Sequence, residues 1–181
     1  ISGEFNVCMK CWLDLPVTNF HLTEDNDVAR LFWGRVDIQN ATSWFYYRKG
    51  SRYQKLIHSI KYRGIKELGF EAGLRLGNLL LLSENFQTID IIVPVPLHPK
   101  KKKERGFNQS EWIAKGIAKS FYHPVASDNL CRIIYNPTQT LKDRYGRWQN
   151  VEGIFNIRDP GVFEGKHILL IDDVVTTGST L

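Results

Sequence analysis

Near its C-terminal end the chain carries an apolar run that stops at two adjacent carboxylates. The run covers residues 168–171 (ILLI), and Asp172 and Asp173 follow it directly. A short continuous apolar run of this kind is typical of a parallel strand that is covered on both faces. Ligands of open α/β sheets bind beyond the carboxyl ends of such strands. The run therefore predicts an α/β fold with a functional edge at Asp172 and Asp173.

A turn rich in hydroxyl groups follows the carboxylates. Gly178 permits a tight backbone path on which successive N–H groups can point at one anion. The neighbouring hydroxyl donors are Thr176, Thr177, Ser179 and Thr180. A helix that began here would add its positive end. Two adjacent carboxylates would repel the same phosphate, so Asp172 and Asp173 are better suited to accept hydrogen bonds from ribose hydroxyls or to hold Mg²⁺.

The stretch 168–180 resembles the 5-phosphoribosyl 1-pyrophosphate (PRPP) binding motif of type I phosphoribosyltransferases. The resemblance implies a twisted, mainly parallel sheet flanked by helices, with Asp172 and Asp173 as catalytic residues and Mg²⁺ ligands and with 176–180 as the phosphate-binding residues. A Walker-type loop is excluded because its Gly-Lys-Ser/Thr ending is missing. The alternative without a function is an ordinary buried strand followed by a Ser/Thr-rich turn.

A second apolar run ends in prolines and is followed by a basic cluster. The run covers residues 91–97, and the cluster covers residues 100–105 (KKKKER). The prolines place the basic residues on a loop beyond a strand end. If the two strands are neighbours, this loop supplies positive charge and backbone donors to a pyrophosphate whose ribose is held by the aspartates. The candidate binding residues here are Leu97, His98, Lys100 and Arg105.

Four sequence blocks narrow the resemblance to the ComF family, which comprises phosphoribosyltransferase-like proteins associated with natural competence. The blocks are residues 56–64 (LIHSIKYRG), 94–109 (PVPLHPKKKKERGFNQ), 138–151 and the PRPP motif, and they occur in the family's order. The resemblance spans about residues 8–181. It implies a glycosyltransferase activity that moves the phosphoribosyl group of PRPP to an unidentified nucleophile and releases pyrophosphate, in the context of DNA uptake.

The third block is polar and suits a cover over the site. Residues 136–150 contain Pro137, Gly146, three basic side chains and two aromatic side chains, a composition typical of a mobile loop. The segment resembles the loop that closes over PRPP in the family, which implies catalytic roles for Gln139 and Arg144. Without the resemblance, Arg144 is more simply explained as a surface charge.

A cysteine pair near the N-terminus gives a second clue. Cys8 and Cys11 form a C-x2-C pair, whereas Cys131 is remote. One pair cannot close a tetrahedral zinc site. ComF-like proteins resemble one another in an N-terminal four-cysteine zinc ribbon, so we expect Cys8 and Cys11 to be half of a Zn²⁺ site whose other pair lies upstream of residue 1 or is absent. A reduced pair without metal is an equal alternative.

These observations divide the chain into two regions. We expect residues 1–50 to form a partial zinc-ribbon-like and hood region and residues 51–181 to form the phosphoribosyltransferase core. Apolar residues at helical spacing predict helices over 66–82 and 109–121 that pack on the sheet. A phosphate turn normally introduces a further helix and strand, so we expect the C-terminal part of the fold to lie beyond Leu181.

Composition and charge leave the function partly open. The chain has 181 residues, of which 43% are hydrophobic, and a formal net charge of +5. Its apolar runs are too short to cross a bilayer and no signal sequence opens it, which predicts a cytoplasmic protein without membrane insertion. The positive charge suits either PRPP and pyrophosphate or a nucleic acid. Because no general base is evident, a PRPP-responsive regulator without turnover stays open, as do a competence factor that binds single-stranded DNA or competence proteins and a homodimer.

Overall fold

The computed structural model describes residues 7–48, 50–51, 53–62, 64–135 and 153–178. Its centre is a short parallel sheet in which β1 (Ile91–Pro94) pairs with β4 (Ile168–Ile171). Ile91 lies opposite Ile168, and Pro94 lies opposite Ile171. The two apolar runs are therefore neighbouring strands, and the chain has a mixed α/β fold. Parallel pairing brings their carboxyl ends to one edge of the sheet.

The sheet extends by a few residues on the other side of β1. The Ile92 N–H donates to the Pro124 carbonyl at 3.0 Å, and the Ala126 N–H donates to the Ile92 carbonyl at 2.9 Å. Beyond the paired strands, the Val95 N–H still donates to the Ile171 carbonyl at 2.8 Å. This last bond carries the register to the point where Asp172 begins.

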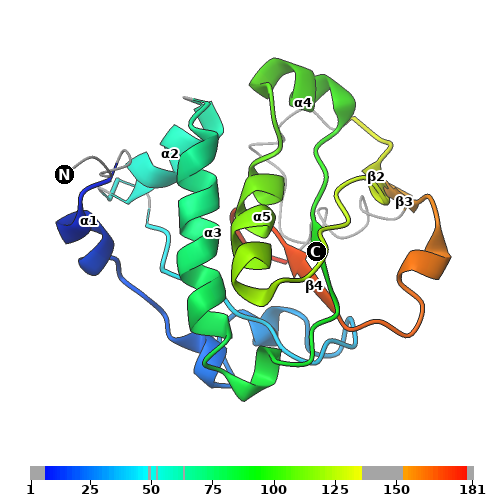
Figure 1. Cartoon of the computed structure of the whole chain (residues 1–181), viewed down its shortest axis with the longest axis horizontal. Coiled ribbons are helices and arrows are strands. Elements are labelled where there is room, and N and C mark those ends of the chain that lie inside the picture. Colours follow the sequence, from blue (N-terminus) through cyan, green and yellow to red (C-terminus); the bar gives the residue numbers. More distant parts are fainter. Residues whose placement is uncertain (1–6, 49, 52, 63, 136–152, 179–181) are drawn as a thin grey trace.

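Two helices lie side by side, and the second of them packs on one face of this sheet (Figure 1). They are α3 (Lys66–Leu80) and α5 (Gln109–Phe121). The helix predicted over 109–121 is confirmed, and the one predicted over 66–82 ends at Leu80. Together with the sheet, α3 and α5 bury an apolar cluster formed by Leu80, Phe86, Ile89, Ile92, Ala114, Ile117, Phe121 and Ile171.

Part of the N-terminal region packs against α3. α1 (Met9–Leu13) is followed by two short 3-10 helices, η1 (Phe20–Leu22) and η2 (Ala29–Leu31), and α2 (Gln54–Tyr62) precedes α3. α1 with the nearby Leu15, α2 and α3 share a second buried cluster of Trp12, Leu15, Leu56, Ile60, Leu68 and Ala72. The first 50 residues thus contribute side chains to a core that α2 and α3 complete.

The remaining elements follow the two central helices. η3 (Glu84–Phe86) leads into β1, and η5 (Pro160–Val162) precedes β4. β2 (Leu130–Arg132) and β3 (Phe155–Ile157) pair antiparallel, with Cys131 opposite Asn156. Among the described residues, no helix is long and apolar enough to cross a membrane.

The expectation that both faces of the 168–171 strand are covered is wrong. Ile168 and Leu170 are each 38% exposed, whereas Ile171 is buried. Among the described residues, α5 covers the face that carries Ile171 and contacts both β1 and β4 there. The apolar run correctly predicted a parallel strand, but it did not show how many faces of that strand are covered.

The basic cluster forms a helix instead of the predicted loop. His98 is the N-cap of this helix, α4 (Pro99–Arg105), and its Nδ1 accepts the Lys100 N–H at 3.2 Å. Pro99 suits the first position of a helix because its missing N–H would have no partner there. Gly106 ends the helix with φ +79°, a left-handed conformation that favours glycine. The caps at His98 and Gly106 thus stabilise a short helix over the charged segment.

Backbone contact between α3 and α5 depends on two glycines. A Cβ atom at Gly73 would lie 2.0 Å from the Ile113 carbonyl oxygen, and one at Gly116 would lie 2.1 Å from the Phe70 carbonyl oxygen. Such distances are far below van der Waals contact. The helices can approach this closely only because neither residue has a side chain.

We therefore expect Gly116→Ala to destabilise the protein. Alanine gains about 1 kcal/mol of helix propensity over glycine, but the clash forces the two helices apart at a cost of about 3 kcal/mol. Thermal unfolding measures the result, with the exposed Lys119→Ala on the same helix as the control. An unfolding temperature of the Gly116 variant at or above that of the unmodified chain would contradict the packing.

Candidate functional site

Asp172 lies where the end of β4 meets the beginning of α5. Its Oδ1 accepts hydrogen bonds from the Ser110 hydroxyl at 3.2 Å and from the Asp173 N–H at 2.8 Å. Ser110 is placed by Asn108, whose Oδ1 caps α5 and whose Nδ2 donates to the Val95 carbonyl at 2.9 Å. The side chain of Asn108 thus links the residue after β1 to the helix that holds the carboxylate at the end of β4.

Asp173 forms an ion pair with Lys61 of α2. Lys61 Nζ lies 2.9 Å from Asp173 Oδ1, and the two side chains are only 21% and 13% exposed. Limited exposure weakens solvent screening, so this pair is stronger than one on the surface. The sequence interpretation gave Lys61 no role, although it lies inside the 56–64 block that carries the family resemblance. Ser110 was missed as well, although it directly follows the 94–109 block.

The surroundings of Asp172 favour its protonated form. Burial and the negative charge of Asp173 raise the pKa of Asp172 to about 6, while the hydrogen bonds from Asp173 and Ser110 and the charge of Lys61 oppose the rise. A carboxyl group that titrates near neutrality at a strand end is a common feature of functional sites. Two carboxylates side by side also provide the oxygen ligands that Mg²⁺ prefers, so both residues fit a magnesium site.

Arg132 lies close enough to Asp172 for their charges to interact, and Lys101 and Arg105 lie near Arg132. Burial lowers the pKa of Arg132 in β2, and the charge of Asp172 opposes this effect. Burial also lowers the pKa of Lys101, and the positive charges of Arg132 and Arg105 lower it further. Like charges at close range repel one another, and a bound anion would relieve that repulsion. No sequence signal marked Arg132, because a single arginine on a short strand has no distinctive pattern.

The predicted anion-binding residues lie in α4 or just before it. The His98 ring packs on Tyr135 with centroids 5.0 Å apart, and Lys100 Nζ lies 5.3 Å from the Tyr135 ring centroid. Arg105 Nη1 donates to the Gln109 side-chain oxygen at 3.0 Å. Leu97 is half-buried where β1 leads into α4. The structure therefore places the basic segment after the strand that neighbours the Asp172 strand.

The turn predicted to bind phosphate is described only as far as Gly178, which has a left-handed backbone conformation. Gly178 has φ +70° and is buried, while Thr176 is exposed and Thr177 is half-buried. The ring of Phe32, from the segment after η2, lies directly against Gly178. Nothing in the sequence suggested this contact, because the two residues are far apart along the chain. Ser179, Thr180, Gln139 and Arg144 lie outside the described residues.

The cysteine pair lies on the surface. Cys8 and Cys11 are both exposed, and hydrogen bonds from Cys11 lower the pKa of the Cys8 thiol. Over the ranges that the structure describes, no group of three His, Cys, Asp or Glu side chains is placed to hold a metal ion. The half zinc site therefore stays a prediction.

Comparison with known proteins identifies relatives of the chain. The DNA utilization protein YhgH of Escherichia coli is 32% identical over 133 residues, which cover 70% of this chain and 56% of that protein. The competence protein ComFC of Bacillus subtilis is 36% identical over 91 residues, 50% of this chain and 35% of that protein. Competence protein F of Haemophilus influenzae is 30% identical over 93 residues, 51% of this chain and 41% of that protein.

These matches cover a larger share of this chain than of the relatives. The chain spans about half the length of the YhgH proteins that it matches, with 56% of the Escherichia coli protein covered. No family model matches the chain, and no solved structure matches it. The two competence proteins among these relatives agree with the family that the four sequence blocks resemble. The chain is thus a homologue of YhgH and of the ComF-type competence proteins.

Proposed function

We propose that the chain is the PRPP-binding part of a ComF-like phosphoribosyltransferase that acts in DNA uptake or DNA utilization. The observation that carries the proposal is the parallel pairing of β1 with β4. It places the carboxylates of Asp172 and Asp173 and the basic segment after Pro94 at the same edge of the sheet. A ligand with a sugar between two groups of negative charge matches this division into acidic and basic parts.

Each part of the edge then has its own task. The turn at 176–178 binds the 5-phosphate through hydroxyl and backbone donors. Asp172 and Asp173 accept hydrogen bonds from the ribose hydroxyls and would be the ligands of Mg²⁺, which supplies charge neutralisation of the pyrophosphate when it is bound. Lys100, Lys101 and Arg132 stabilise the negative charge of the pyrophosphate.

The reaction is a displacement at the anomeric carbon. The bond from this carbon to the pyrophosphate oxygen breaks, the pyrophosphate leaves with the electron pair, and the nucleophile forms the new bond. Positive charge develops on the ribose, and the nearby carboxylates of Asp172 and Asp173 favour it, as carboxylates do in glycoside cleavage. Gln139 and Arg144, which lie outside the described residues, would close over the ligand and exclude water.

A second candidate function is binding of single-stranded DNA. It is favoured by the lysines on α4, since Lys102 and Lys103 are exposed and Lys100 lies beside the Tyr135 ring. Positive charge next to an aromatic ring suits a nucleic-acid strand. The names of the relatives, which refer to DNA utilization and competence, agree with such a role.

The enzyme proposal is tested by calorimetry with PRPP and Mg²⁺ and by pyrophosphate release with candidate acceptors. Asp173→Asn should weaken PRPP binding at least about tenfold, because one charge-assisted hydrogen bond contributes roughly 1.5–3 kcal/mol. The exposed Asp128→Asn is the control. PRPP binding without pyrophosphate release would favour a regulator. If the unmodified protein does not bind PRPP, both the enzyme and the regulator are refuted.

Binding should also depend on pH. With a pKa of about 6, Asp172 is protonated below that pH and loses its ability to hold a cation. Affinity for PRPP with Mg²⁺ should therefore rise between pH 5 and pH 7. Because phosphate monoesters also titrate near pH 6, the readout is the difference from Asp172→Asn, which should show only the titration of the ligand. Equal pH profiles for both proteins would contradict a titrating Asp172.

The DNA-binding candidate predicts a steep salt dependence. If α4 contacts the phosphates of single-stranded DNA, Lys103→Gln should weaken binding and reduce the salt slope by about 1. Lys119→Gln on α5 is a matched control, since it removes an equal charge away from α4. Affinity that does not change with salt, or equal losses in the two variants, would count against a DNA site on α4.

A further inference from the structure

One side of the phosphate turn is covered by an aromatic ring from the N-terminal region. A Cβ atom at Gly178 would lie 3.1 Å from Phe32 Cε1 and 3.2 Å from Phe32 Cζ, and Leu31 Cβ lies 3.5 Å from the same position. Phe32 is only 5% exposed. The left-handed φ of Gly178 is therefore combined with a contact that leaves little room for a side chain.

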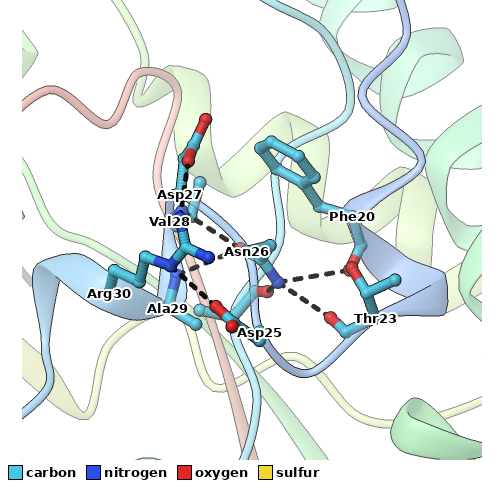
Figure 2. A network of polar contacts seen from close by, with 9 residues as sticks. Phe20, Thr23, Asp25, Asn26, Asp27, Val28, Ala29 and Arg30 are labelled. Carbon is cyan, nitrogen blue, oxygen red and sulfur yellow. Dashed lines mark hydrogen bonds and ion pairs between the residues drawn. The ribbon is translucent and has the colours of Figure 1, made fainter.

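The segment that carries Phe32 is organised around one buried side chain, Asn26, shown in Figure 2. Asn26 is 4% exposed, and its Oδ1 accepts the N–H groups of Val28 and Ala29, both at 3.0 Å. Its Nδ2 donates to the carbonyls of Thr23 and Ala41, both at 2.9 Å, and more weakly to that of Phe20 at 3.4 Å. The side-chain amide of Asn26 thus joins three stretches of backbone, because its nitrogen donates hydrogen bonds and its oxygen accepts them.

Backbone hydrogen bonds transmit this arrangement to Phe32. The Arg30 N–H donates to the Asn26 carbonyl at 3.0 Å, and the Phe32 N–H donates to the Ala29 carbonyl at 3.0 Å. Arg30 also pairs with Asp25 at 2.7 Å, but this ion pair is exposed and contributes little. The position of the Phe32 ring therefore depends on the buried amide of Asn26 more than on surface charges.

We infer that Phe32 is a positioning residue for the 5-phosphate of PRPP, and that Asn26 holds Phe32 in place. This inference rests on the proposed function, because it assigns the phosphate to the 176–178 turn. Phe32 would act only through Gly178, from the side of the turn that the ring occupies. A turn that is held in one conformation presents its donors without reorganisation, which is how a rigid support increases affinity.

The inference predicts different effects on the binding of two ligands, whereas a general loss of structure would weaken the binding of both. Ribose 5-phosphate uses the turn as well as the aspartates, whereas pyrophosphate with Mg²⁺ uses the basic segment and the aspartates but not the turn. Phe32→Leu should weaken binding of ribose 5-phosphate about tenfold, since small displacements of positioning groups have effects of this size or larger. Binding of pyrophosphate with Mg²⁺ should change less than about twofold. Calorimetry on the full chain measures both affinities.

The control is Phe86→Leu, which makes the same change in the apolar cluster under the sheet, where Phe86 is also 5% exposed. It should lower the unfolding temperature and leave the ratio of the two affinities unchanged. Asn26→Asp is the second variant of the site. It keeps the shape of the side chain but replaces the donor by an oxygen that faces three carbonyl groups, so it should reproduce the selective loss seen with Phe32→Leu.

The outcomes are distinct. A selective loss of ribose 5-phosphate binding in both variants supports the inference. Equal losses for both ligands, or unchanged affinities in Phe32→Leu and Asn26→Asp, would overturn it while the proposed function stands. If the unmodified protein binds neither ligand, the proposed function fails and the inference fails with it.

Discussion

The parallel pairing of β1 with β4 is the interaction on which the rest of the structure depends. It brings two distant segments to one edge of the sheet, and the bond from the Val95 N–H to the Ile171 carbonyl extends that register to the first aspartate. In the part of the chain that the structure describes, α5 supports the pairing from one face and contacts both strands. Close approach through Gly73 and Gly116 packs α3 against α5, and the Asn108 side chain caps the start of α5. The position of Ser110 beside Asp172 follows from that start.

The edge of the sheet at the carboxyl ends of β1 and β4 combines negative and positive side chains. Partial burial of either kind would be unfavourable without the other. Asp172 and Asp173 repel each other, and burial raises the pKa of Asp172 to about 6. Lys61 balances Asp173, while Arg132 and Lys101 are crowded on the basic side. Groups of this kind cost stability unless something pairs with them, and functional sites commonly accept such a cost. A ligand that carries both sugar hydroxyls and phosphates would satisfy the two sides together.

Sequence reasoning recovered those parts that local patterns determine. Apolar runs at 91–97 and 168–171 predicted the two strands, whose pairing only the structure shows, and helical spacing predicted α5 with its bounds. The predictions of a strand covered on both faces and of a basic loop were wrong. Coverage of a strand depends on neighbours in space, and the basic segment forms a helix capped by His98 and Gly106. Lys61 and Ser110 lay inside or next to family blocks and could have been chosen. Phe32 and Arg132 could not, because only the folded chain brings them to Gly178 and Asp172.

The central claim is that one sheet edge divides a phosphorylated sugar between a turn, a carboxylate pair and a basic segment. A crystal structure of the protein with ribose 5-phosphate and Mg²⁺ tests it most directly. The account predicts the phosphate against residues 176–178, with the ribose hydroxyls within hydrogen-bond distance of Asp172 or Asp173. A phosphate found on the lysines of α4, with the sugar away from both aspartates, would contradict it.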